Sequence, residues 1–194
     1  SPLSLKNCEI WLDASDQSYL FANKDGTDPV LLNGDPVGYW GDKSGKNYNF
    51  TNVYGTEANR PKYISNSFNS LPAIRFDGSS SYLTLNTSIS TLSSDYTAFI
   101  VAAKHNLTSV VGRVLTQTRQ PSSTDLQRGY CALVTQSNSL NTASLVDNGT
   151  FATTSWRALS TFDIFTQRIS ASPVDNNTGF TGNIRNGKVS QGGT

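Results

Sequence analysis

Apolar residues in this chain recur at every second position, in short runs such as AIRFDG (73–78), GRVLTQT (112–118) and GYCALVTQ (129–136). A spacing of two places alternate side chains on opposite faces of an extended chain, so it predicts β-strands rather than amphipathic helices. Turn signals separate the runs at Gly26, Gly45, Asp77-Gly78, Asn148-Gly149 and Asn186-Gly187. Many short strands joined by such turns are typical of an antiparallel β-sandwich.

The pattern predicts individual strands along the whole chain. EIWLDA (9–14) reads as a strand, and residues 35–40 approach another. The runs 73–78 and 81–86 flank a Gly-Ser turn, which predicts a hairpin. The apolar run 97–104 is the longest, as expected of a central strand covered on both faces. Further strands are predicted at 112–118, 129–136, 142–149, 156–165 and 183–190, with short helical turns near 15–22 or 89–94.

Composition limits the class of protein. A chain of 194 residues fits one all-β domain, so residues 1–194 are predicted to form a single domain. Charged residues make up only 15 % of the chain and aromatic residues 10 %, which together are typical of a folded surface or extracellular β protein. The net charge is +1 and its cations are scattered, so nucleic-acid binding is not expected. No apolar run is long enough to predict insertion into a membrane.

Four motifs lie within the first part of the chain: WLDASD (11–16), YWGDKSG (39–45), RPKY (60–63) and PAIRFDGSSSYL (72–83). Together they resemble the entry half of laminin G-like and concanavalin A-like lectin domains, of the type found in phage and bacterial surface proteins. The resemblance implies an antiparallel jelly-roll β-sandwich. It also implies recognition or attachment as the function, without catalysis.

The end of the chain departs from this family. Such sandwiches normally continue with further strands after the Asn-Gly turn, whereas this chain stops at residues 191–194. The sandwich is therefore predicted to lack its last strands, to continue in a longer protein, or to be covered by a neighbouring subunit. An uncovered edge strand invites pairing with another chain, which predicts partners in an assembly.

Catalytic residue patterns are missing from the sequence. Glucanases of the concanavalin A type place Glu-x-Asp-x-Glu on one strand, but this chain has only Glu9 and Glu57 and no such pair of carboxylates. His105 is the only histidine, and no Gly-x-Ser-x-Gly motif is present. Cys8 and Cys131 are expected to be buried packing thiols, with a disulfide as the alternative. We therefore expect no enzymatic activity.

Two groups of residues could bind ligands. The NKDGTD loop offers Asn23, Asp25 and Asp28 as oxygen ligands for calcium, with an ordinary Asp-Gly turn as the alternative. The polar, aromatic stretch 47–60 is the expected carbohydrate-contact loop, because sugars bind aromatic rings flanked by planar polar groups. The candidate contact residues are Asn47, Tyr48, Asn49, Tyr54, Asn59, Tyr63 and Trp156.

The motif residues also have a structural interpretation. Trp11 and Trp40 are expected to be core aromatics. Asp13, Asp16 and Asp42 are expected to accept backbone N–H bonds in Asx turns, with Ser15 and Ser44 beside them. Arg75 and Asp77 are expected to brace a strand end.

Two functional classes follow from these patterns. In the first, the chain is a virion structural or surface domain (a fibre, tail or capsid-decorating component) that binds other subunits through an open sheet edge and contacts cell-surface glycans. In the second, it is a secreted or cell-surface carbohydrate-binding adhesion module. Both place it on a virion surface or outside the cell. The Ser/Thr/Asn-rich composition and the incomplete C-terminal edge favour the first.

Overall fold

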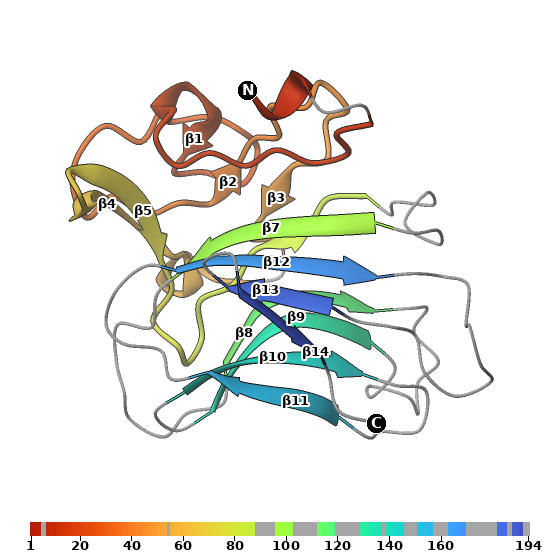
Figure 1. The fold of residues 1–194 in the computed structure, drawn as a ribbon. Coiled ribbons are helices and arrows are strands. Elements are labelled where there is room, and N and C mark those ends of the chain that lie inside the picture. Colours follow the sequence, from red (N-terminus) through yellow and green to blue (C-terminus); the bar gives the residue numbers. More distant parts are fainter. Residues whose placement is uncertain are drawn as a thin grey trace. The chain divides into compact units, whose positions relative to one another are not determined.

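The computed structural model describes residues 1–4, 7–53 and 55–87, together with the strands that lie between residues 96 and 191 (Figure 1). The chain divides into two compact units, Ser1–Ile89 and Ser90–Thr194. The described residues form antiparallel strands and three short 3-10 helices. The prediction of an all-β, antiparallel protein is therefore confirmed for this part of the chain.

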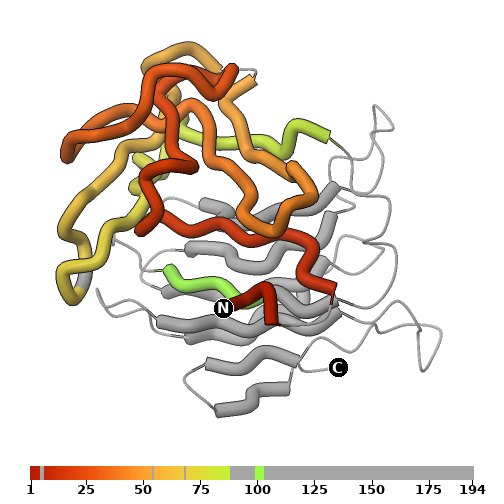
Figure 2. Tube along the Cα trace, turned by 90° about the horizontal axis from the view of Figure 1, so that it is seen from above, coloured from red at the N-terminus to blue at the C-terminus, as the bar shows by residue number. Residues whose placement is uncertain are grey.

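The first unit contains a sheet of very short strands. It joins β1 (Leu20–Phe21), β2 (Tyr39–Trp40), β3 (Phe50–Thr51) and β6 (Thr84–Leu85) in the order β1-β2-β3-β6. Figure 2 follows the Cα path of this unit from red at its start to yellow towards its end. Because each strand has only two residues, the ladder alone fixes little of the chain, and loop contacts must do the rest.

Short 3-10 helices interrupt these loops: η1 (Pro2–Ser4), η2 (Gln17–Tyr19) and η3 (Glu57–Asn59). The Asp16 carboxylate caps η2 by accepting a hydrogen bond from the Ser18 backbone N–H. This confirms the helical turn predicted near 15–22. The alternative site at 89–94 lies outside the described residues.

A separate hairpin joins β4 (Lys62–Phe68) to β5 (Leu71–Arg75). Its two-residue turn, Asn69-Ser70, has positive φ at both positions, the geometry that hairpin turns favour. The hairpin predicted between 73–78 and 81–86 is therefore wrong, since β5 pairs with β4 whereas β6 pairs with β3.

Residues 9–14 form no strand, contrary to prediction. Their backbone groups bond instead to the loop after β2: the Trp11 N–H donates to the Asp42 carboxylate, and the Trp11 carbonyl accepts from the Lys43 N–H. An extended segment held in this way shows strand-like alternation in its sequence without having a partner strand.

The core of the first unit is small. Leu20, Val30, Val37 and Tyr63 are buried together, and Trp40 and Ile74 pack against them. Gly38 packs closely against the backbone of Ala22, the residue that follows β1. A Cβ atom at position 38 would come within 2.2 Å of the Ala22 carbonyl oxygen. The prediction of Trp40 as a core aromatic is confirmed.

The second unit has longer strands in two four-stranded sheets (Figure 1). One sheet has the order β14-β13-β12-β7, with β7 (Tyr96–Ala102), β12 (Asp163–Ile169), β13 (Gly182–Arg185) and β14 (Lys188–Gln191). The other has the order β11-β10-β9-β8, with β8 (Gly112–Thr118), β9 (Gly129–Gln136), β10 (Ser139–Leu145) and β11 (Phe151–Trp156).

Several sequence-based strands are confirmed here. The bounds predicted for β8 and β9 match the structure, and β13 and β14, which flank the predicted Asn186-Gly187 turn, pair with each other. The apolar run 97–104 does form a strand, but its predicted central position is wrong. β7 lies at one end of its sheet, and Phe99 and Val101 are 64 % and 65 % exposed.

Candidate functional site

Residues of the WLDASD and YWGDKSG motifs form a hydrogen-bond network centred on the side chain of Asp42. The Asp42 carboxylate is buried, and its Oδ1 accepts from the N–H groups of Trp11 and Ser44, each at 2.9 Å. Its Oδ2 accepts from the Ser44 hydroxyl at 2.6 Å and from the Tyr48 N–H at 3.1 Å. One carboxylate thus ties the segment before η2 to the loop after β2.

Asn49, at the other end of the loop, adds two hydrogen bonds to this network. Its side-chain oxygen accepts from the Asp42 N–H at 2.9 Å, and its carbonyl accepts from the Asn86 N–H at 2.9 Å. The Asn49 side chain is therefore engaged in holding the loop. The loop between Asp42 and Asn49 is fixed at both ends by these bonds.

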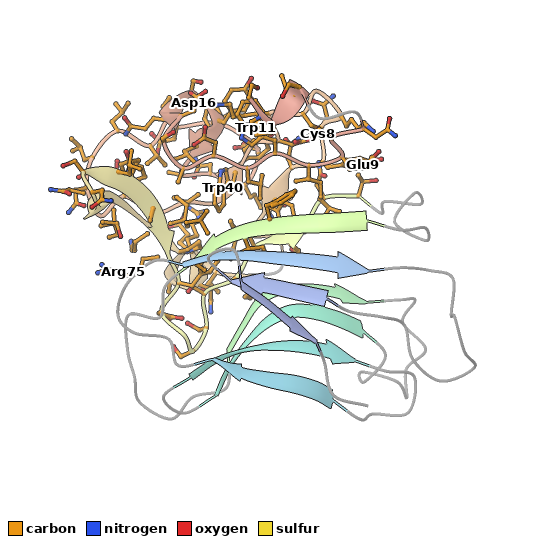
Figure 3. The ribbon with its side chains drawn as sticks, in the orientation of Figure 1. Cys8, Glu9, Trp11, Asp16, Trp40 and Arg75 are labelled. Carbon is orange, nitrogen blue, oxygen red and sulfur yellow. The ribbon has the colours of Figure 1, made fainter. Side chains whose placement is uncertain are left out.

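Lys43 follows Asp42 in the chain and lies among two carboxylates and two aromatic rings. Its ammonium group is 3.0 Å from Asp13 Oδ2 and 2.8 Å from Asp16 Oδ2. It also lies 4.4 Å from the centre of the Trp11 ring and 5.7 Å from that of Tyr19, within cation–π range. We call Lys43, Asp13 and Asp16 the Lys43 bracket; Figure 3 labels Trp11 and Asp16 beside each other.

The bracket changes the acidity of its members. Hydrogen bonds from Lys43 and Ser18 hold the pKa of Asp16 below its ordinary value. Partial burial acts to raise the pKa of Asp13, but hydrogen bonds from Ser15 and Lys43 outweigh it and lower that pKa as well. The bond to Asp16 raises the pKa of Lys43. All three groups are therefore charged at neutral pH.

Asp77 has the same structural task in the loop after β5. Its Oδ1 accepts from the N–H groups of Ser79, Ser80 and Ser81 at 2.8 to 2.9 Å. These backbone bonds hold the pKa of Asp77 far below its ordinary value. The carboxylate holds the turn of the chain between β5, which pairs with β4, and β6, which pairs with β3. Arg75 is exposed on β5 and lies apart from the Trp11 cluster in Figure 3.

The predicted calcium loop is closed by its own hydrogen bonds. Asp25 Oδ1 accepts from the N–H and hydroxyl of Thr27, at 3.1 and 2.6 Å, which lowers the pKa of Asp25. Asn23 donates to the Thr27 hydroxyl, while its oxygen accepts from Arg60 at 3.4 Å. Asp28 is exposed, with a φ of 63°. Within the described residues no three His, Cys, Asp or Glu side chains gather as a metal site. Calcium binding stays a prediction.

The residues predicted to contact carbohydrate differ in their exposure to solvent. Asn47 is exposed and Tyr48 half-buried, next to one another in the loop after β2. Tyr63 is only 5 % exposed and belongs to the core, so its ring offers no exposed platform. Tyr54 lies outside the described residues, as does the side chain of Trp156, whose backbone ends β11.

Asn59 acts within its own loop. Its side-chain oxygen accepts from the Thr56 hydroxyl, and its amide donates to the Ser80 carbonyl at 3.1 Å. Asn52, which is 2 % exposed, donates to the carbonyls of Asn59 and Tyr82. Asn52 lies in the stretch 47–60 that was predicted to contact carbohydrate, but the structure buries it. These bonds stitch the 52–60 loop to the segment around Ser80.

Lys43 was missed as a site residue. The signal available was its place in YWGDKSG beside a motif with two aspartates, since a lone lysine among carboxylates often pairs with them. Cys8, labelled in Figure 3, is a free thiol. The Cys131 side chain lies outside the description.

Comparison of the chain with protein-family models, curated proteins and solved structures gave no match. The described residues contain no helix with the length and apolar character that crossing a bilayer requires.

Proposed function

We propose that this chain is a non-catalytic structural domain on the surface of a virion, such as a fibre, tail or capsid-decorating component, built as a jelly-roll sandwich. It mediates assembly or attachment through an open sheet edge. The virion assignment depends on the resemblance of the four motifs to laminin G-like domains of phage and bacterial surface proteins.

The observation that carries the proposal is the sheet β14-β13-β12-β7. Among the described strands, none pairs with the outer side of β7 or of β14. On β7, Phe99 and Val101 are about two-thirds exposed although both are apolar. A strand that has no partner on its outer side among the described strands, and that carries exposed apolar side chains, is a template for another chain.

The use of the carboxylates supports a non-catalytic function. Asp13, Asp16, Asp25, Asp35 and Asp77 all have pKa values below the ordinary one, each because hydrogen bonds stabilise the charged form. A glycosidase acid needs the opposite shift, since it must keep its proton near neutral pH. These carboxylates hold turns and loops.

Glycan contact is a secondary part of the proposal. Asn47 and Tyr48 remain available beside one another, whereas Asn49, Asn59 and Tyr63 are engaged inside the unit. The same residues would serve the alternative, a secreted or cell-surface adhesion module. Because three of the five predicted contacts whose side chains are described are engaged inside the unit, we place assembly first.

Light scattering on the full chain tests the proposal. We expect a defined oligomer, which Val101→Lys shifts towards the monomer because a charge on the exposed face of an edge strand opposes pairing. Leu31→Lys is the matched control, since Leu31 is 69 % exposed in a loop of the other unit, and this substitution should leave the mass unchanged. A wild-type chain that stays a 21.0 kDa monomer contradicts assembly and leads to a glycan array with and without calcium.

A further inference from the structure

The segment from Glu9 to Asp16 is attached to the loop Asp42–Lys46 by an unusual set of contacts. A single backbone–backbone bond, from the Lys43 N–H to the Trp11 carbonyl at 2.8 Å, links the two. The other polar links use side chains: Asp42 accepts from the Trp11 N–H, and the Ser44 hydroxyl donates to the Glu9 carbonyl. No strand ladder fixes this segment, in contrast to Leu20 onwards.

Ion pairs supply the remaining polar links. The Lys43 bracket joins the loop to both turn aspartates, and Lys46 lies 2.5 Å from the Glu9 carboxylate. The bracket aspartates also shape the segment itself, since Asp13 Oδ1 binds Ser15 and Asp16 Oδ1 binds Ser18. Each aspartate thus uses one oxygen for its own turn and the other for Lys43.

We propose that the 9–16 segment is a charge-held latch: the Lys43 bracket closes it onto the 42–46 loop, and loss of the bracket's charge opens it while the β1-β2-β3-β6 sheet stays folded. The sheet does not depend on the bracket, because its own contacts begin at Tyr19, whose carbonyl accepts from the Gly41 N–H at 2.7 Å. Local opening of a segment with few ladder bonds is a common low-energy event.

The charged groups around the bracket determine the pH at which the segment opens. Asp13 and Asp16 approach Lys43 from the segment, with the Trp11 and Tyr19 rings beside them. Asp42 comes from the loop, and Glu9 and Lys46 form the neighbouring pair. Because the pKa values of Asp13 and Asp16 are lowered in the folded chain, their contribution is complete above the ordinary carboxyl pKa. It is lost as the pH falls below that value.

Amide hydrogen exchange on the full chain tests the latch. The double variant Asp13→Asn/Asp16→Asn keeps an oxygen for Ser15 and Ser18 but removes the charge that faces Lys43. At pH 6 we expect the protection of the Trp11 and Lys43 amides to fall by about fivefold. The amides of Val30 and Asn52, which bond within the sheet region, should stay unchanged. Asp25→Asn is the matched control, since Asp25 holds Thr27 in the same way outside the bracket.

The possible results separate the latch from its competitors. Unchanged protection at Trp11 and Lys43 in the double variant overturns the proposal, because the half-buried Ile10 and Leu12 would then hold the segment. Equal loss at Val30 and Asn52 also overturns it, because the segment would not open separately. Acidifying the wild type from pH 6 to 3 should lower protection at the latch first. If the double variant shows the same acid response as the wild type, the charge of the bracket does not hold the segment, and the proposal is overturned.

Discussion

The two units of this protein make antiparallel sheets in different ways. In Ser1–Ile89 the main sheet consists of strands of two residues, and buried or turn-forming aspartates hold the loops between them. In Ser90–Thr194 the strands run for four to eight residues and form longer ladders, such as the seven-residue pairing of β12 with β7. In the first unit, side chain–backbone bonds supplement very short ladders, whereas the described part of the second unit consists of long backbone ladders.

This difference determines which substitutions each unit tolerates. A ladder is insensitive to most side chains but sensitive to the loss of a backbone N–H. A carboxylate hub has the opposite property, since one side chain satisfies several backbone donors at once. The motifs of the first unit are therefore short and specific, whereas the second unit has only alternation to recognise.

The largest effect should come from breaking a central ladder. Thr166 of β12 pairs with Phe99 of β7 and with Ile184 of β13. Thr166→Pro removes a backbone donor between two neighbours, so we expect it to lower the free energy of unfolding of the second unit by more than about 3 kcal/mol. Urea unfolding followed by far-UV circular dichroism measures the change.

Lys188→Pro is the control for this substitution, because proline is tolerated at the first residue of an edge strand, and Lys188 begins β14. It should cost much less. Equal losses from Thr166→Pro and Lys188→Pro would show that the ladder is not what holds this unit.

A smaller but still large effect is expected at the Asp42 hub. Asp42→Ala leaves the N–H groups of Trp11, Ser44 and Tyr48 without their acceptor, which should cost about 2 to 3 kcal/mol. Asp42→Asn keeps one oxygen and should cost less. Hydrogen exchange should show the loss in residues 9–53 while β12 and β13 keep their protection. Loss in both units together would favour the single domain predicted from the sequence.

The local chemistry of the first unit could be predicted from its sequence. Ser15 does bond to Asp13, and Ser44 to Asp42, in the Asx turns that the motifs indicated. The burial of Tyr63 also had a signal, because in RPKY it alternates with the exposed Lys62. Interpreting this tyrosine as a sugar platform gave too little weight to that alternation.

Pairings between distant residues could not be predicted in the same way. Alternation identifies β5 and β6 as extended but does not name their partners, so the sequence predicts a hairpin between two neighbouring runs that in the structure pair with other strands. The apolar run of β7 indicates a strand, yet its place in the sheet depends on which later strand pairs with it. Lys43 lies about 30 residues from Asp13 and Asp16, beyond the reach of local patterns.

The smallest effect concerns a single exposed turn and depends on pH. Asp77→Asn keeps an oxygen for the Ser79, Ser80 and Ser81 N–H groups but removes the charge that they stabilise. Because the folded pKa of Asp77 lies below the unfolded one, its carboxylate stabilises the fold above the ordinary carboxyl pKa and progressively less below it. Urea midpoints should therefore be lower for the variant than for the wild type at pH 7, and the gap should narrow from pH 4 to pH 2. A gap that is constant over this range would mean that the turn depends on the shape of Asp77 and not on its charge, and the aspartates of the first unit would then act as acceptors alone.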